Sequence, residues 1–156
     1  MSMPHAPLIE LSEVRSHEQR QALRKISRIN PRGSKFSRPL GMRLVDVSHL
    51  EIQNQISGFF TDDNNTPTFA VCDGDVVGAS VAPTLDGGCL GFVPPELRLF
   101  PKLRELSVEQ SDLDWIAPWI AKMPNLEELR FQYNEIAEIP PYVCKMNKLR
   151  DRKSVV

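Results

Sequence analysis

Cysteine and histidine are scarce in this chain of 156 residues, which contains three of each. The cysteines are Cys72, Cys89 and Cys144, and the histidines are His5, His17 and His49. Neither set has the spacing of metal ligands, and no histidine has a serine, cysteine or aspartate at motif spacing. The P-loop, GxGxxG and HExxH motifs are missing from the sequence as well. We therefore predict no catalytic residue, no metal, no cofactor and a chain that is not an enzyme.

Two local patterns admit a second interpretation. An odd number of cysteines favours three reduced thiols, but a disulfide between Cys72 and Cys89 would suit the N-terminal cap of a secreted repeat protein. Asp73 and Asp75 flank a glycine, as in a calcium loop, yet the other ligands of such a loop are missing. A turn at this glycine is the favoured interpretation.

Long apolar runs are absent too. No run approaches the roughly 18 residues that a membrane span needs. The first thirty residues are polar and basic, without the apolar core of a signal peptide. We expect no membrane span, no signal peptide and a cytoplasmic protein.

Charge is distributed unevenly along the chain, although the formal net charge is only −1. Residues 15–43 carry nine basic side chains and one acid, whereas residues 44–150 carry sixteen acids and eight bases. Ser16 and Gln19 can form a capping box, and the apolar residues that follow lie on one side of a helix over Ser16–Ile29. The Pro, Gly and Ser content of Asn30–Gly41 predicts a linker. We expect a flexible basic arm, with binding to anionic lipid or nucleic acid as the alternative.

The middle of the chain has the pattern of a cap for a repeat array. A second capping box, Ser48 with Glu51, predicts a helix that stops before Pro67. An alternating segment around the Asp73-Gly74 turn signal predicts a β-hairpin. The candidate side chains for closing the core at this end are Phe59, Phe60 and Phe69.

A repeat of 23 residues follows this segment, because Leu103, Leu126 and Leu149 are equally spaced. Two full copies superpose at nearly every apolar position, for example Leu106 on Leu129, and Ser111 falls on Asn134. An earlier, irregular copy places residues 76–81 on 103–108 if about four extra residues follow the first strand, as is usual for terminal repeats. We expect Ser111 and Asn134 to bind the backbone of the turn after each strand.

The pattern LxxLxLxxNxLxxIPxxVxxMxx resembles the 23-residue class of leucine-rich repeats, found in Ras-group and plant-resistance-type intracellular proteins. The resemblance implies an α/β solenoid whose short parallel strands line a concave face, with a helical N-terminal cap. It also implies a scaffold or adaptor that binds a protein partner through that face and has no catalysis of its own. The alternative is a regulatory or targeting segment of a larger signalling enzyme, a kinase or a ubiquitin ligase.

Four segments are expected from these patterns. They are a basic N-terminal arm (residues 1–43), a helix-hairpin cap (residues 44–75), about three repeats (residues 76–150) and a tail (residues 151–156). The tail resembles translated sequencing adapter, so we expect the natural protein to continue with further repeats; the alternative is a genuine short polar tail.

The strand residues between the buried positions should point to the concave face, where equivalent residues of adjacent repeats lie about 5 Å apart. Arg and Tyr are enriched in interface hot spots, so this face is the predicted partner-binding site. Its residues are Arg104, Glu105, Ser107, Glu109, Gln110, Glu127, Glu128, Arg130, Gln132 and Tyr133.

Three aromatic residues, Trp115, Trp119 and Tyr142, stand at positions that are polar in other copies of the repeat. We expect them to be at least partly exposed. An exposed aromatic patch would mark either an interface or a contact with a neighbouring segment, and both interpretations stay open here.

Overall fold

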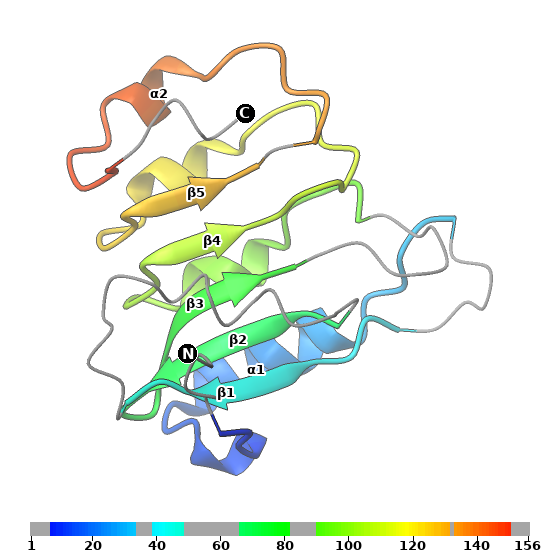
Figure 1. The fold of residues 1–156 in the computed structure, drawn as a ribbon, viewed down its shortest axis with the longest axis vertical. Coiled ribbons are helices and arrows are strands. Elements are labelled where there is room, and N and C mark those ends of the chain that lie inside the picture. The colour runs from blue at the N-terminus through cyan, green and yellow to red at the C-terminus, as the bar shows by residue number, and fades with distance from the viewer. Residues whose placement is uncertain (1–6, 34–38, 49–65, 82–89, 132, 151–156) are drawn as a thin grey trace, which may run out of the picture.

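The described part of the computed structural model, residues 7–33, 39–48, 66–81, 90–131 and 133–150, is built around one five-stranded sheet. Its strands follow the order β1-β2-β3-β4-β5 (Figure 1). They are β1 (Arg43–Asp46), β2 (Thr68–Cys72), β3 (Asp75–Ser80), β4 (Glu105–Ser107) and β5 (Glu128–Arg130). The helices are α1 (His17–Ser27) and α2 (Pro141–Cys144), with short 3₁₀ helices η1 (Leu11–Glu13), η3 (Pro95–Leu99) and η4 (Pro118–Lys122).

The predicted solenoid is wrong. In a solenoid each coil contributes one parallel strand, but here the sheet is mixed: β2 and β3 form an antiparallel hairpin, and β1 pairs in parallel with β2. The described residues contain only two α-helices, and the connections before β4 and β5 carry 3₁₀ turns of five residues. The fold is therefore a mixed α/β sheet, in which β3, β4 and β5 form one parallel run and β1 and β2 another, with the antiparallel β2–β3 hairpin between them.

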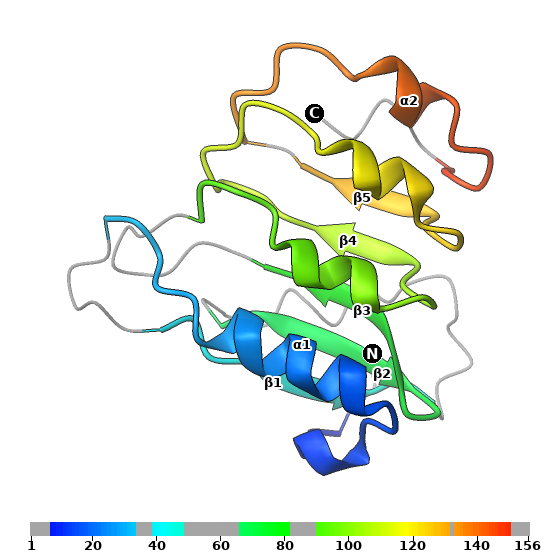
Figure 2. The same cartoon turned by 180° about the vertical axis from the view of Figure 1, so that it is seen from behind.

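The helices α1, η3, η4 and α2 all lie on one face of the sheet (Figure 2). The main core lies between this face and the helices, and it includes the fully buried Leu106, Leu129 and Phe131. Phe69, predicted to close the core, is buried there with its ring edge-on to that of Phe100 at a centroid distance of 6.3 Å. Phe59, Phe60 and the helix predicted around them lie outside the described residues.

The residue alignment of the repeats is confirmed by strand register, even though the solenoid is not. Glu105 pairs with Glu128 and Leu106 with Leu129, which is the 23-residue spacing. Gly78 pairs with Glu105 and Ala79 with Leu106, which reproduces the alignment with four additional residues. The pattern of apolar residues therefore predicted which residues would stand side by side.

The β2–β3 hairpin turns at Asp73 and Gly74, whose φ angles are 49° and 85°. Positive φ at both central residues is the requirement of a two-residue type I′ turn. A side chain at Gly74 would also collide with Arg15, because an added Cβ would lie 2.4 Å from its Cγ. Asp73 is therefore a turn residue, as the favoured interpretation of this segment has it. The Asp75 carboxylate forms an ion pair with Lys102 at 3.0 Å.

The helix α1 of the basic N-terminal segment packs on the core and is not part of a free arm. Ser16 caps α1 by accepting a hydrogen bond from the Gln19 backbone N–H, which is one half of the predicted capping box. The Gln19 side chain, which would form the other half, bonds the sheet instead. One side of the helix buries Leu23 and Ile26 completely, and the helix packs against η3. Burial of this apolar side holds α1 on the sheet.

Gln19 links α1 to the sheet by two hydrogen bonds. Its side-chain amide donates to Asp75 Oδ1 and its Oε1 accepts from the Val76 backbone N–H, both at 3.0 Å. Gln19 is itself buried, so both bonds are shielded from water.

Gln19→Glu should destabilise the protein by about 1–3 kcal/mol, because it replaces a buried donor with a second carboxylate beside Asp75. The free energy of unfolding in urea at pH 7 measures this. Gln21→Glu makes the same change in charge two residues along α1 and should cost much less. Equal losses in the two variants would contradict this role of Gln19.

Asn134 joins the last two repeats through its side-chain amide. Its Oδ1 accepts from the backbone N–H groups of Ser111 and Leu113 at 2.8 and 3.1 Å. Its Nδ2 donates to the carbonyls of Val108 and Phe131, both at 2.8 Å. The predicted role of Asn134 is confirmed, while the Ser111 hydroxyl donates to the Glu109 carbonyl of its own turn at 3.0 Å.

Asn134→Ala should lower the free energy of unfolding by about 2–4 kcal/mol, because four backbone groups lose their side-chain partner. Asn125→Ala is the matched control, since its exposed amide makes one bond to a backbone carbonyl and one to Lys148. That control should cost less than about 1 kcal/mol. Urea titrations of the two variants at one pH give the comparison, and a control as costly as Asn134→Ala would refute the bridging role.

Candidate interaction face

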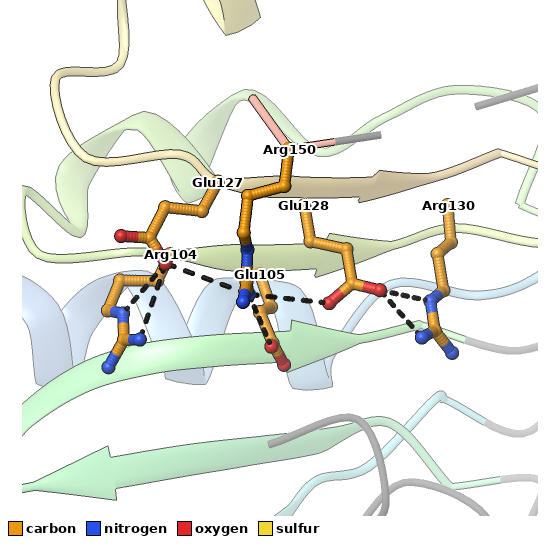
Figure 3. Close-up of polar contacts among 6 residues, drawn as sticks. All are labelled: Arg104, Glu105, Glu127, Glu128, Arg130 and Arg150. Atoms are coloured by element: carbon orange, nitrogen blue, oxygen red, sulfur yellow. Dashed lines mark hydrogen bonds and ion pairs between the residues drawn. The ribbon is translucent and has the colours of Figure 1, made fainter. Parts of the chain in front are cut away.

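The face of β4 and β5 that points away from the helices carries a group of charged side chains. Because side chains alternate along a strand, burying Leu106 and Leu129 against the helices turns Glu105, Glu128 and Arg130 to the opposite face. We call this surface the helix-free face. Figure 3 shows its charged residues, which are Arg104, Glu105, Glu127, Glu128, Arg130 and Arg150.

Three of these residues occupy the same position in successive 23-residue repeats. The backbone N–H of Arg104 donates to Val77 O, that of Glu127 to Arg104 O, and that of Arg150 to Glu127 O, at 2.8–2.9 Å. Arg104, Glu127 and Arg150 therefore stack along the sheet with alternating charge. Arg104 bonds Glu127 Oε2 at 3.3 Å through Nη2.

Arg130 holds the Glu128 carboxylate from the same strand. Its Nε and Nη2 donate to Glu128 Oε1 at 2.8 and 2.6 Å. Two charge-assisted hydrogen bonds to one carboxylate oxygen hold both side chains in orientation. Figure 3 shows the carboxylates of Glu127 and Glu128 on either side of the Arg150 guanidinium.

Glu105 lies at the centre of this group and is buried. Its side chain is only 3% exposed, and neither carboxylate oxygen has a hydrogen-bond partner among the described residues. The paired positions on its two neighbouring strands are Gly78, which has no side chain, and Glu128, which is an acid. Among the described residues, the cation within ion-pair distance of Glu105 is Arg150, whose Nη2 lies 3.7 Å from Glu105 Oε1.

Burial is the largest cause and the neighbouring Glu128 carboxylate the next in raising the pKa of Glu105 from 4.5 to about 7, against the opposing effect of Arg150 and Arg104. The folded protein therefore binds this proton more tightly than the unfolded chain does between these two pH values. It follows that the free energy of unfolding falls as the pH rises through this window.

In the unaltered protein the free energy of unfolding should fall by about 3 kcal/mol between pH 4.5 and 7.5, and Glu105→Gln should remove this fall. Urea unfolding at half-unit pH intervals measures this. Glu109→Gln makes the same chemical change outside the pair and should retain the slope of the parent. A parent stability that rises over this range, or a slope unchanged by Glu105→Gln, would contradict the assignment.

The other predicted binding residues lie beside this group. Ser107 is half-buried on β4 between Ser80 and Arg130, and Glu109 is half-buried after the strand. Gln110 and Tyr133 occupy equivalent repeat positions, both with positive φ, and Tyr133 is 75% exposed. Gln132 lies outside the described residues.

The three aromatic candidates differ in exposure. Trp115 is 60% exposed, whereas Trp119 and Tyr142 are half-buried against the main core. The Tyr142 hydroxyl donates a hydrogen bond to the Ile116 carbonyl. Of the three, Trp115 is therefore the side chain most available to a partner.

Arg150 is the residue of the charged group that sequence reasoning missed. The prediction took adjacent pairs from the two complete repeats and stopped before the third. The signal was present, since Arg150 follows Glu127 by the same 23 residues that separate Glu127 from Arg104. Extending the register by one repeat would have identified it.

The basic residues of the N-terminal segment are partly used in packing. The Arg20 guanidinium donates to the carbonyls of Val14 and Arg15 at 2.5 and 2.8 Å. Lys25, Arg28 and Arg32 remain exposed.

Within the described ranges, no cluster of three or more His, Cys, Asp or Glu side chains could hold a metal ion. Cys72 and Cys144 are free thiols, and Cys89 lies outside the described residues. Burial raises the pKa of the Cys72 thiol. None of the helices in the described part is both long and apolar enough to cross a membrane.

Comparison with protein families, with curated proteins and with solved structures finds no match to this chain. The resemblance to leucine-rich repeats therefore stays a prediction that rests on the residues quoted for it. The helix-free face has to be interpreted from its own chemistry.

Proposed function

We propose that this chain is a protein-interaction module that binds a protein partner through the helix-free face of β4 and β5, without catalytic chemistry of its own. The observation that carries the proposal is the buried Glu105 carboxyl at the centre of ordered charges. Ser107 continues this face along β4 beside Arg130, and the exposed Tyr133 follows β5 in the chain.

The energetic argument starts from what the charged group contributes to folding. Ion pairs that water can reach, such as the half-buried pairs of Arg104 and Arg130, add little stability, typically about 0–1 kcal/mol each. A buried carboxyl without a hydrogen bond lowers stability. Local arrangements that cost stability are expected at functional sites, so this face is a candidate for recognition and a poor candidate for a stabilising device.

The composition of the face supports a protein partner. Arginine and tyrosine are enriched among interface hot spots, and here they lie on short strands and adjacent turns of one sheet. Salt links hold Arg104 and Arg130 in defined directions, so little side-chain entropy is lost when a partner binds. A partner in the same polypeptide, such as a catalytic domain, would use the same surface.

A photo-cross-linking amino acid at Ser107 should form adducts with one protein in cells that express the chain. The same amino acid at Lys122, exposed on the helix-covered side, should not capture that protein. Arg130→Glu should reduce the Ser107 adduct by about tenfold, since charge reversal at an interface costs both affinity and association rate.

Lys122→Glu applies the same reversal of charge outside the face and should leave the adduct unchanged. Mass spectrometry of the adducts identifies the captured protein and its yield. Equal capture from Ser107 and Lys122, or equal sensitivity to the two charge reversals, would refute binding through the helix-free face.

A further inference from the structure

Glu105 is a carboxyl that the fold buries without a donor. Neither of its oxygens has a hydrogen-bond partner among the described residues, and its side chain is 3% exposed. A carboxylate in such a place is stabilised most by a cation that also donates hydrogen bonds. Neither of the positions paired with it on adjacent strands, Gly78 and Glu128, offers one.

Arg150 supplies charge to this site without hydrogen bonds. Its Nη2 lies 3.7 Å from Glu105 Oε1, 3.7 Å from Glu127 Oε2 and 4.0 Å from Glu128 Oε2. These separations exceed the distances of charge-assisted hydrogen bonds, which are about 2.7–2.9 Å. The Arg150 side chain is 45% exposed, so it can leave the site at little cost.

The two other arginines of the group, Arg104 and Arg130, pair with the outer carboxylates and not with Glu105. Arg104 bonds Glu127, and Arg130 makes two bonds to Glu128. These pairs hold the two outer carboxylates apart, with Glu105 beneath the space between them (Figure 3). The arrangement leaves three carboxylates facing one place, and among the described residues the Arg150 guanidinium lies there, without a hydrogen bond to any of them.

We propose that this place is a subsite for one arginine side chain of the protein partner, and that Arg150 stands in for that side chain in the isolated protein. Guanidinium suits the subsite better than ammonium, because it is planar, weakly hydrated and able to donate to several carboxylates at once. This inference rests on the proposed function of the helix-free face and adds the chemistry of the residue that the partner inserts.

The test uses the full chain and the peptide acetyl-Gly-Arg-Gly-amide, followed through the ¹³C signal of the Glu105 carboxyl at pH 8. The arginine peptide should shift this signal, while the matched peptide with neutral citrulline should not. Arg150→Gln should tighten binding by about tenfold or more, because an intramolecular competitor present at about millimolar effective concentration is removed. Glu105→Gln should abolish the saturable response at the signals of Glu127 and Glu128.

The pKa of Glu105 in the unaltered protein gives a second test, which does not depend on whether a variant folds. In the unaltered protein, saturating arginine peptide should lower the pKa of Glu105, and the citrulline peptide should leave it unchanged. The subsite would be overturned if the arginine and citrulline peptides shifted the Glu105 signal equally. It would also be overturned if neither the unaltered protein nor Arg150→Gln responded to the arginine peptide. An equal response to a lysine peptide would overturn the assignment to guanidinium.

Failure of this proposal can be told apart from failure of the proposed function. If the Ser107 adduct forms and depends on Arg130 while the peptides have no effect at Glu105, the face binds its partner without an arginine subsite. If the peptides act as expected while cross-linking from Ser107 and Lys122 is equal, the subsite binds arginine but the partner interface is elsewhere.

Discussion

The in-register parallel pairing of β4 with β5 is the constraint on which the rest of this structure depends. It places Leu106 beside Leu129 on the side of the helices and, by alternation, Glu105 beside Glu128 on the other side. Asn134 maintains the pairing beyond the strands, because its amide binds backbone groups of both coils. Without this register the apolar ladder of the core and the charged group of the helix-free face would both be lost.

The same register places two acids, Glu105 and Glu128, opposite one another on adjacent strands. Like charges directly opposite one another on adjacent strands are unfavourable, and burial of Glu105 adds the cost of desolvation. Ion pairs with Arg104 and Arg130 offset the repulsion at Glu127 and Glu128, and the charge of Arg150 offsets it at Glu105 without a hydrogen bond. The core of the protein therefore determines where its charges lie. On this face three arginines balance three carboxylates in charge, but none of them donates a hydrogen bond to Glu105.

The N-terminal half shows why the solenoid prediction was wrong. The repeat pattern covers the strands from β3 onward, and the register of those strands follows it. The sheet extends past β3 through an antiparallel hairpin and then a parallel β1, while α1 covers the same face as the 3₁₀ turns. Neither β1 nor α1 has a counterpart in the repeats, and an amphipathic basic helix looks the same in sequence whether it packs or extends freely.

The sequence by itself determined which residues pair in β3, β4 and β5, the cap of α1 at Ser16 and the asparagine that joins the coils. These features follow from periodic apolar residues and from local backbone hydrogen bonding, both of which are written along the chain. Only the tertiary structure decided that α1 belongs to the core, that Glu105 is buried without a donor and that Arg150 lies over it. Desolvation and charge balance depend on groups that the fold gathers from separate coils, so the spacing of residues alone does not reveal them.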